Sequence, residues 1–108
     1  MSVYMVTANY NSSSVKGMVA NPHNREEAIK GLLDKLGVEL KSLYVTHGGK
    51  IYMVCSGTAD AMGTMGMVVM ATGSIENPSI EEVVSGENQM AWMEAAQQFS
   101  TAYKPANA

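Results

Sequence analysis

Hydrophobic and polar residues repeat along this chain with two different periods, and each change of period marks a new element. Segments rich in β-branched and aromatic residues, or alternating between polar and apolar positions, are typical of strands. Apolar residues spaced three and four apart are typical of helices that bury one face. The pattern predicts strands at 3–10, 38–46, 51–56 and 74–85, and helices at 22–36, 59–71 and 87–103.

The first of these helices has the clearest pattern. Asn21 and Pro22 supply an N-cap and a first helical residue, and Gly37 supplies a stop. A shorter helix is expected before it, capped by one of the serines at 12–14. The apolar residues of the long helix fall at i, i+3, i+4 and i+7, namely Ile29, Leu32, Leu33 and Leu36.

The order of the elements, βαββαβ, is that of the split βαβ or ferredoxin-like fold. The segment His47-Gly48-Gly49-Lys50 predicts the hairpin between the second and third strands. We therefore expect an α+β two-layer sandwich in one domain at 1–104, with an added C-terminal helix and a flexible tail at 105–108. The added helix must pack onto another surface, because one side repeats Trp92, Ala96, Phe99 and Tyr103.

A two-layer sandwich leaves one face of its sheet without helices. In this chain that face is expected to carry Tyr44 and either Tyr4 or Met5, which are poorly suited to water. Only 16% of the residues are charged, which favours assigning part of the apolar surface to a subunit interface. We predict that a second copy covers the face, which makes the protein a homodimer or higher homo-oligomer.

Composition argues against several classes of function. The formal net charge is −3, and seven basic residues spread along the chain form no surface for the phosphates of nucleic acid. No apolar run approaches the ~20 residues that span a bilayer, and no signal-peptide pattern opens the chain. Cys55 is the only cysteine, which suits a reducing compartment. We expect a cytoplasmic protein that binds neither nucleic acid nor membranes.

Methionine is concentrated in the second long helix. Packing in the core is the favoured interpretation, because methionine fills irregular apolar gaps. Its thioethers could instead bind copper(I), or form an exposed contact surface. Gly63 and Gly66 would let a sheet or a second subunit approach this helix closely. The methionines concerned are Met62, Met65, Met67 and Met70.

A spaced set of residues resembles the GYD domain family. The matching segments span about residues 3–85. The resemblance implies a ferredoxin-like protomer of the dimeric α+β-barrel type, in which the sheets of two subunits pair around a shared cavity. It implies no particular reaction. The segments are Tyr4-Met5-Val6, Asn21-Pro22 with Arg25 and Ala28, Leu36-Gly37, Leu40-Lys41-Ser42-Leu43-Tyr44-Val45-Thr46, and the glycine hairpin.

The Gly-Tyr-Asp tripeptide of that family is not retained. Gly49-Lys50-Ile51 stands in its place, and Tyr52 is displaced along the strand. The family's aspartate has no counterpart here, and His47 could replace it by position only. Related barrels include cofactor-independent monooxygenases, haem-handling enzymes, isomerases and regulatory ligand-binding modules, and the fold does not choose among them.

Hydroxyl side chains follow one face of the second strand. Ser42, Tyr44 and Thr46 alternate along it, so they could line a small cavity with polar tips or form a hydrogen-bond ladder between subunits. Asn9 and Tyr52 could join this lining. We predict these five residues as the ligand-binding set, and we predict no metal site and no cofactor.

Three other residues carry reactive groups. His47 is the candidate catalytic residue because an imidazole can exchange a proton near neutral pH, although a hairpin histidine often has no such role. Cys55 lies in an apolar strand without nearby cations, which favours a buried, inert thiol over a nucleophile. His23 has polar neighbours and is expected on the solvated surface.

Three hypotheses for the function follow. The first is a homo-oligomeric small-molecule-binding or regulatory module, with its ligand held between paired sheets. The second is a small cofactor-independent enzyme, monooxygenase-like or isomerase-like, with His47 as the base and Tyr44 or Tyr52 as an orienting acid. The third is a structural protein that self-assembles through its methionine-rich and C-terminal helices. The sequence alone does not decide between an enzyme and a protein without catalytic activity.

Overall fold

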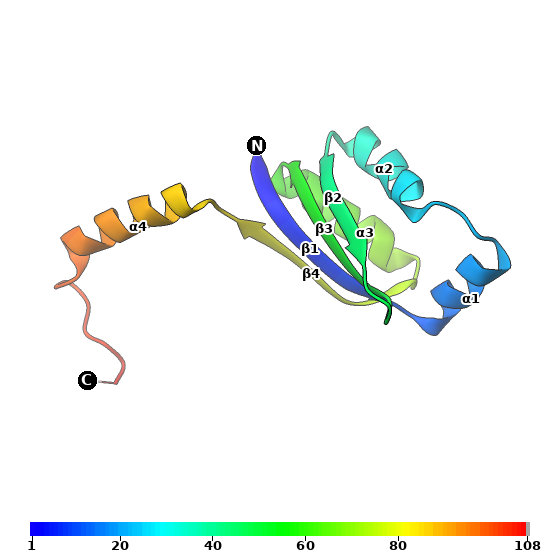
Figure 1. Cartoon of the computed structure of the whole chain (residues 1–108). Helices are drawn as coiled ribbons and strands as arrows, with labels where there is room; N and C mark the ends of the chain where they lie inside the picture. Colours follow the sequence, from blue (N-terminus) through cyan, green and yellow to red (C-terminus); the bar gives the residue numbers. More distant parts are fainter. Residues whose placement is uncertain (108) are drawn as a thin grey trace.

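The computed structural model describes residues 1–107 and has one four-stranded antiparallel sheet with helices on one of its faces (Figure 1). The strand order is β2-β3-β1-β4, and every neighbouring pair is antiparallel. This α+β arrangement is consistent with the ferredoxin-like fold, as predicted. The elements are β1 (Ser2–Tyr10), α1 (Ser12–Ala20), α2 (Arg25–Leu36), β2 (Glu39–Val45), β3 (Lys50–Gly57), α3 (Ala59–Ala71), β4 (Ile75–Val83) and α4 (Gly86–Phe99).

The predicted start of the first long helix is wrong by three residues. Asn24, and not Asn21, caps α2, and its side chain accepts hydrogen bonds from the backbone N–H groups of Glu26 and Glu27. Asn24 prevails because the two acidic residues then fall in the first turn, where the helix dipole favours negative charge. Gly37 ends the helix in the left-handed conformation, as predicted.

Alternate residues of β1 and β3 point toward α2 and α3 and form the core. Because side chains alternate between the two faces of a sheet, this set has a strict spacing of two along each strand. Leu33 of α2 and Met62 of α3 are fully buried against it. The strand residues of the core are Tyr4, Val6, Ala8, Ile51, Met53 and Cys55.

The methionine-rich helix is only partly a core helix. Met62 and Met65 are buried, as the core interpretation predicts. Met67 lies on the outer side of α3 with 69% of its surface exposed, and Met70 is exposed as well. The outer methionines therefore form apolar surface that packing within one chain does not use.

One of the two helix-interior glycines permits close packing. A Cβ atom at Gly66 would lie 3.0 Å from the Cδ1 atom of Ile80 on β4, so Gly66 lets the strand approach α3. A Cβ atom at Gly63 would meet nothing within 4 Å. The expectation of close approach is thus met at Gly66 and not at Gly63 within this chain.

The edge strand β4 has an irregularity next to its proline. Asn77, just before Pro78, has a positive φ of 51°, and the pairing of β4 with β1 shifts its register between Thr7 and Asn9. An edge strand tolerates a proline, because one side of the strand has no partner to lose.

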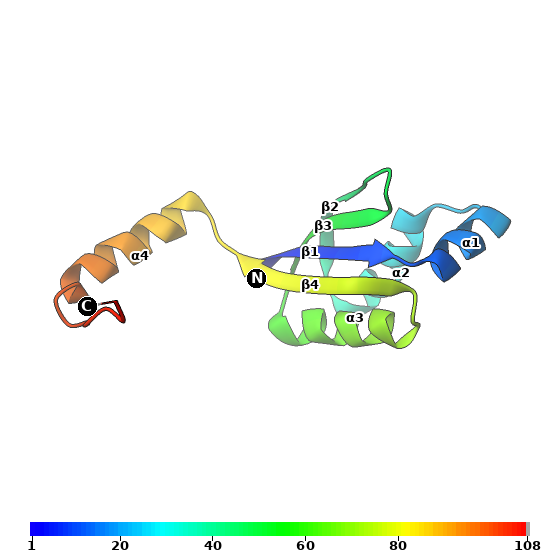
Figure 2. The same cartoon turned by 90° about the horizontal axis from the view of Figure 1, so that it is seen from below.

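Helix α4 extends away from the sandwich and packs on nothing in the same chain (Figures 1 and 2). All of its residues are exposed, including Trp92 at 61%. The helix ends at Phe99, four residues before the predicted end. The predicted flexible tail stays a prediction, since its last residue, 108, lies outside the described residues.

The two glycines of α3 should respond differently to alanine. Gly63→Ala is expected to raise the free energy of unfolding by ~0.5–1 kcal/mol, since alanine is the better helix former and the added methyl group meets only open space. Gly66→Ala should gain clearly less, because its methyl group presses on Ile80. Urea unfolding of both variants tests this, and equal gains would contradict the packing described.

Candidate functional site

The sheet face opposite α2 and α3 is covered by no other described element of the chain (Figure 1). Strand pairing aligns its side chains in rows that cross all four strands. One row carries a hydroxyl group on every strand. Its members are Tyr44 on β2, Tyr52 on β3, Thr7 on β1 and Ser79 on β4.

The rows to one side of the hydroxyl row carry both apolar and acidic side chains, since Glu81 of β4 pairs with Met5 and Glu39 of β2 pairs with Ser56. Met5 is 37% exposed at the centre of the sheet, and Tyr44 is 72% exposed on the edge strand. Val54 lies beside Met5, and Val3 and Val83 form the next pair. The uncovered face therefore combines a row of hydroxyl groups with exposed apolar side chains and with carboxylates such as that of Glu81.

Four of the five predicted ligand-binding residues lie on this uncovered face. Ser42, Tyr44 and Tyr52 occupy neighbouring positions, and Asn9 follows Thr7 at the end of the sheet, opposite Lys50. Alternation along the strands places these four on one side.

Thr46 has a different position, just beyond the end of β2. Its Oγ1 atom accepts a hydrogen bond of 3.0 Å from the backbone N–H of Lys50. Its hydroxyl oxygen thus helps to close the β2–β3 hairpin. Next to this hairpin, the ammonium group of Lys50 lies 5.0 Å from the ring centroid of Tyr52, so the rim of the face also carries positive charge.

The two histidines lie at the surface. His47 is exposed in the turn of the β2–β3 hairpin. His23 is exposed between α1 and α2, as predicted, but it is not isolated: its ring bonds to the carbonyl oxygen of Asn21 at 2.7 Å and to Nη1 of Arg25 at 3.0 Å. Neither histidine lines the cavity that lies between the sheet and helices α2 and α3.

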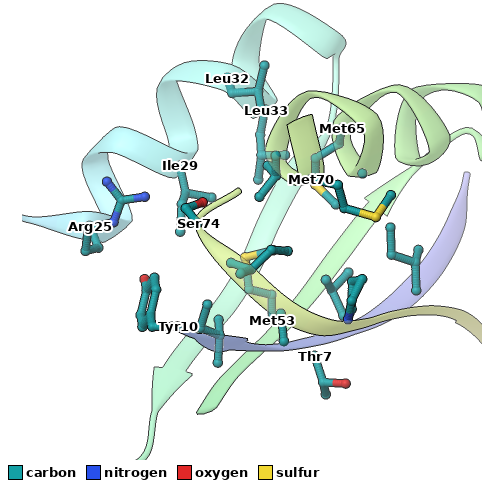
Figure 3. A pocket seen from close by; sticks show the side chains of 18 of the residues that line it. Thr7, Tyr10, Arg25, Ile29, Leu32, Leu33, Met53, Met65, Met70 and Ser74 are labelled. Atoms are coloured by element: carbon teal, nitrogen blue, oxygen red, sulfur yellow. The ribbon is translucent and has the colours of Figure 1, made fainter. Parts of the chain in front are cut away.

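A cavity of about 150 Å³ lies between the sheet and helices α2 and α3 (Figure 3). Its walls are largely aliphatic, with Leu32 and Met65 among them. Tyr10 and Arg25 also line it. The hydroxyl oxygen of Tyr10 and the Nε atom of Arg25 are buried and have no hydrogen-bond partner in the described chain.

Sequence reasoning did not identify this cavity. The alternation of Tyr4, Val6 and Ala8 along β1 could have placed Tyr10 on the helix side. Arg25 belongs to the segments that resemble the GYD domain family, but no periodic pattern assigns it to a cavity, and by position it is an ordinary solvent-facing residue near the start of a helix. Its position depends on how α2 is set against the end of β1, which is a tertiary property.

The described residues contain neither a cluster of metal-ligating side chains nor a membrane-spanning helix. Within residues 1–107, no three His, Cys, Asp or Glu side chains gather closely enough to hold a metal ion. None of the helices in the same range is both long and apolar enough to cross a bilayer.

The single cysteine is part of the core. Cys55 is 0% exposed, and burial raises the pKa of its thiol above the ordinary value of 9.0, because a thiolate would be poorly solvated there. A nucleophilic cysteine needs the opposite, a lowered pKa and access to substrate. These properties fit the expected inert thiol.

No protein-family model matches the chain, and no curated protein is significantly similar to it in sequence. The resemblance to the GYD domain family therefore rests on the residues quoted above and stays a prediction.

The buried thiol should make the free energy of unfolding fall as the pH rises in the alkaline range. The folded protein keeps the Cys55 proton at pH values where the unfolded chain loses it. The contribution of Cys55 to the free energy of unfolding is therefore complete below pH 9.0 and is lost as the pH rises through the raised pKa. One such group can lower the free energy of unfolding by at most about 1.4 kcal/mol for each pH unit.

Urea unfolding between neutral and strongly alkaline pH measures this slope. Cys55→Ala is the control, because it lacks the thiol but keeps every tyrosine and lysine. The decline with pH should be smaller in the variant, whereas identical slopes would contradict the assignment.

Proposed function

We propose that the protein is a homo-oligomeric small-molecule-binding or regulatory module, with its ligand held between the sheets of two copies. The observation that carries this proposal is the apolar, hydroxyl-bearing sheet face that has no cover in one chain. The resemblance to the GYD domain family supports the same arrangement, since it implies sheets that pair around a shared cavity.

An uncovered apolar face carries a free-energy cost in water. Contiguous apolar patches above a few hundred Å² are uncommon on monomers and mark interaction sites. Tyr44, Tyr52, Met5 and Val83 are large apolar side chains that all lie exposed on this one face. A partner that buries them recovers roughly 25 cal/mol for each Å² of apolar surface removed from water.

The available area suits a second copy. Four strands spaced ~4.8 Å apart, with about seven residues each rising ~3.3 Å, form a face of roughly 19 by 23 Å, or about 440 Å². The 14 residues of α4 add a strip of about 21 by 10 Å. Together they approach the ~800 Å² that each partner buries in an interface of standard size.

Helix α4 gives an independent reason to expect a partner. An isolated helix shorter than about 12–15 residues is marginal in water, so α4 needs a surface to pack on. Its exposed apolar residues are available for that purpose. We therefore assign α4 to the same assembly as the sheet face. The exposed apolar residues of α4 are Met90, Trp92, Met93 and Phe99.

The hydroxyl row gives the paired faces the chemistry of a ligand site. Small-molecule sites are mostly apolar, with a few convergent polar groups that orient the ligand. Tyr44, Tyr52 and Thr7 would supply such groups beside Met5, while the Ser79 hydroxyl group already donates to Oε1 of Glu81 at 3.1 Å. The enzyme alternative finds less support, because its base, His47, is exposed in the hairpin turn.

Met5→Glu should separate the copies. A carboxylate at the centre of the paired faces would be buried without a partner, which should raise the dissociation constant of the dimer at least ~100-fold. Native mass spectrometry of the freshly purified protein is expected to detect a dimer with a bound small molecule. The same measurement on Met5→Glu should detect an empty monomer.

Met67→Glu is the matched control, because it introduces the same charge at a more exposed methionine on α3, on the other side of the sheet. It should remain a dimer. A monomeric, empty unmodified protein would contradict the proposal. Dissociation of Met67→Glu alone would instead favour assembly through the methionine-rich helix.

A further inference from the structure

We propose a second binding site, on the helix side of the sheet, for a small monocarboxylic acid whose apolar part is about the size of a benzene ring. The site is the cavity between β1, β4, α2 and α3, with Arg25 and Tyr10 at one end (Figure 3). It lies on the side of the sheet away from the proposed dimer face and does not depend on it.

The size and walls of the cavity define the apolar part of the ligand. Its volume of about 150 Å³ is similar to that of an engineered apolar cavity that binds benzene. Aliphatic and thioether side chains surround it, including Ile29, Leu32, Met53, Met65 and Val69. Such walls offer water few partners and favour a hydrocarbon group.

Two unpartnered donors define the polar part. The Nε atom of Arg25 and the hydroxyl group of Tyr10 are buried, and neither has a hydrogen-bond partner in the described chain. In Figure 3 the hydroxyl end of Tyr10 points toward the helix that carries Arg25. Leaving such groups unsatisfied costs free energy, and most buried polar groups in proteins are bonded. A ligand with two acceptor atoms satisfies both.

Nearby hydrogen bonds hold the guanidinium in a suitable orientation. The carbonyl oxygen of Asn21 can only accept, so Nδ1 of His23 donates to it, and Nε2 of a neutral His23 ring accepts from Nη1 of Arg25. The edge formed by Nε and Nη2 is left for another partner. That edge is one of those that bind a carboxylate with two parallel hydrogen bonds.

The charge of Arg25 has no counter-ion within the described chain. Within residues 1–107, no carboxylate lies within ion-pair distance of its guanidinium group. Other polar residues of the lining do not compete for the ligand. Ser74 pairs its hydroxyl with that of Thr72 at 2.6 Å, and Thr7 points away from the cavity in Figure 3. An anion is therefore the chemical class that the free groups select.

Titration with benzoate tests the site, using protein whose methionine methyl groups carry ¹³C. Methyl resonances of Met53, Met65 and Met70, which line the cavity, should shift in a saturable manner. Met5, on the opposite face, should not shift. Benzamide, which has the same shape without the charge, should bind at least ~10-fold more weakly, as expected when a charged hydrogen bond becomes neutral.

Substitutions test the two donors against matched controls on the uncovered sheet face. Arg25→Met should weaken benzoate binding at least ~10-fold, and Tyr10→Phe about 3-fold to 10-fold. Lys50→Met and Tyr52→Phe remove a cation and a phenolic hydroxyl group from the other face and should leave the affinity of the cavity for benzoate unchanged. If Arg25→Met fails to fold, Arg25→Lys should fold and still bind more weakly, because an ammonium lacks the planar edge.

Two results would overturn the proposal. One is the absence of saturable shifts up to about 10 mM benzoate, a concentration that would half-saturate a site with a dissociation constant of about 10 mM. The other is binding that survives Arg25→Met and Tyr10→Phe but is lost in Lys50→Met or Tyr52→Phe. That second result would place the carboxylate on the uncovered sheet face and so leave the proposed function standing.

Discussion

A four-stranded sheet with helices on only one side is the constraint on which the other features of this protein depend. The covered side holds the buried core, and the opposite side exposes Met5 and Tyr44 to water. Apolar surface of this extent favours association, because burial removes it from water. The sheet thus has two faces with different chemistry: one that no element of the single chain covers and one that borders a cavity beneath α2 and α3.

Much of the fold could be predicted from the sequence, because periodicity is a local property. Alternation along β1 and β3, and the apolar spacing of α2, predicted these elements and their order. The errors lie at helix ends, where neighbouring residues compete. Asn21 and Asn24 can both cap a helix, and acidic residues that complement the dipole decide for Asn24. Helix α4 ends at Phe99 rather than at the predicted residue 103, and helix ends are where local patterns are least precise.

The two candidate sites differ in how far the sequence could reveal them. Ser42, Tyr44 and Tyr52 share a face because strand alternation requires it once the register is set, so residues in this region were accessible to prediction. The cavity with Tyr10 and Arg25 arises where the end of a strand meets the start of a helix. No periodic signal marks such a junction, and only the assembled structure places the two side chains beside one cavity.

The most direct test of the central claim measures whether the uncovered face is exposed to water in the unmodified protein. A soluble paramagnetic agent broadens methyl resonances according to their exposure to solvent. In the single chain, Met5 is 37% exposed and Met67 is 69% exposed. If a second copy covers the sheet, the Met5 methyl resonance should be almost unaffected while that of Met67 broadens. Broadening of Met5 to about half the extent of Met67 would match the bare chain and contradict the account.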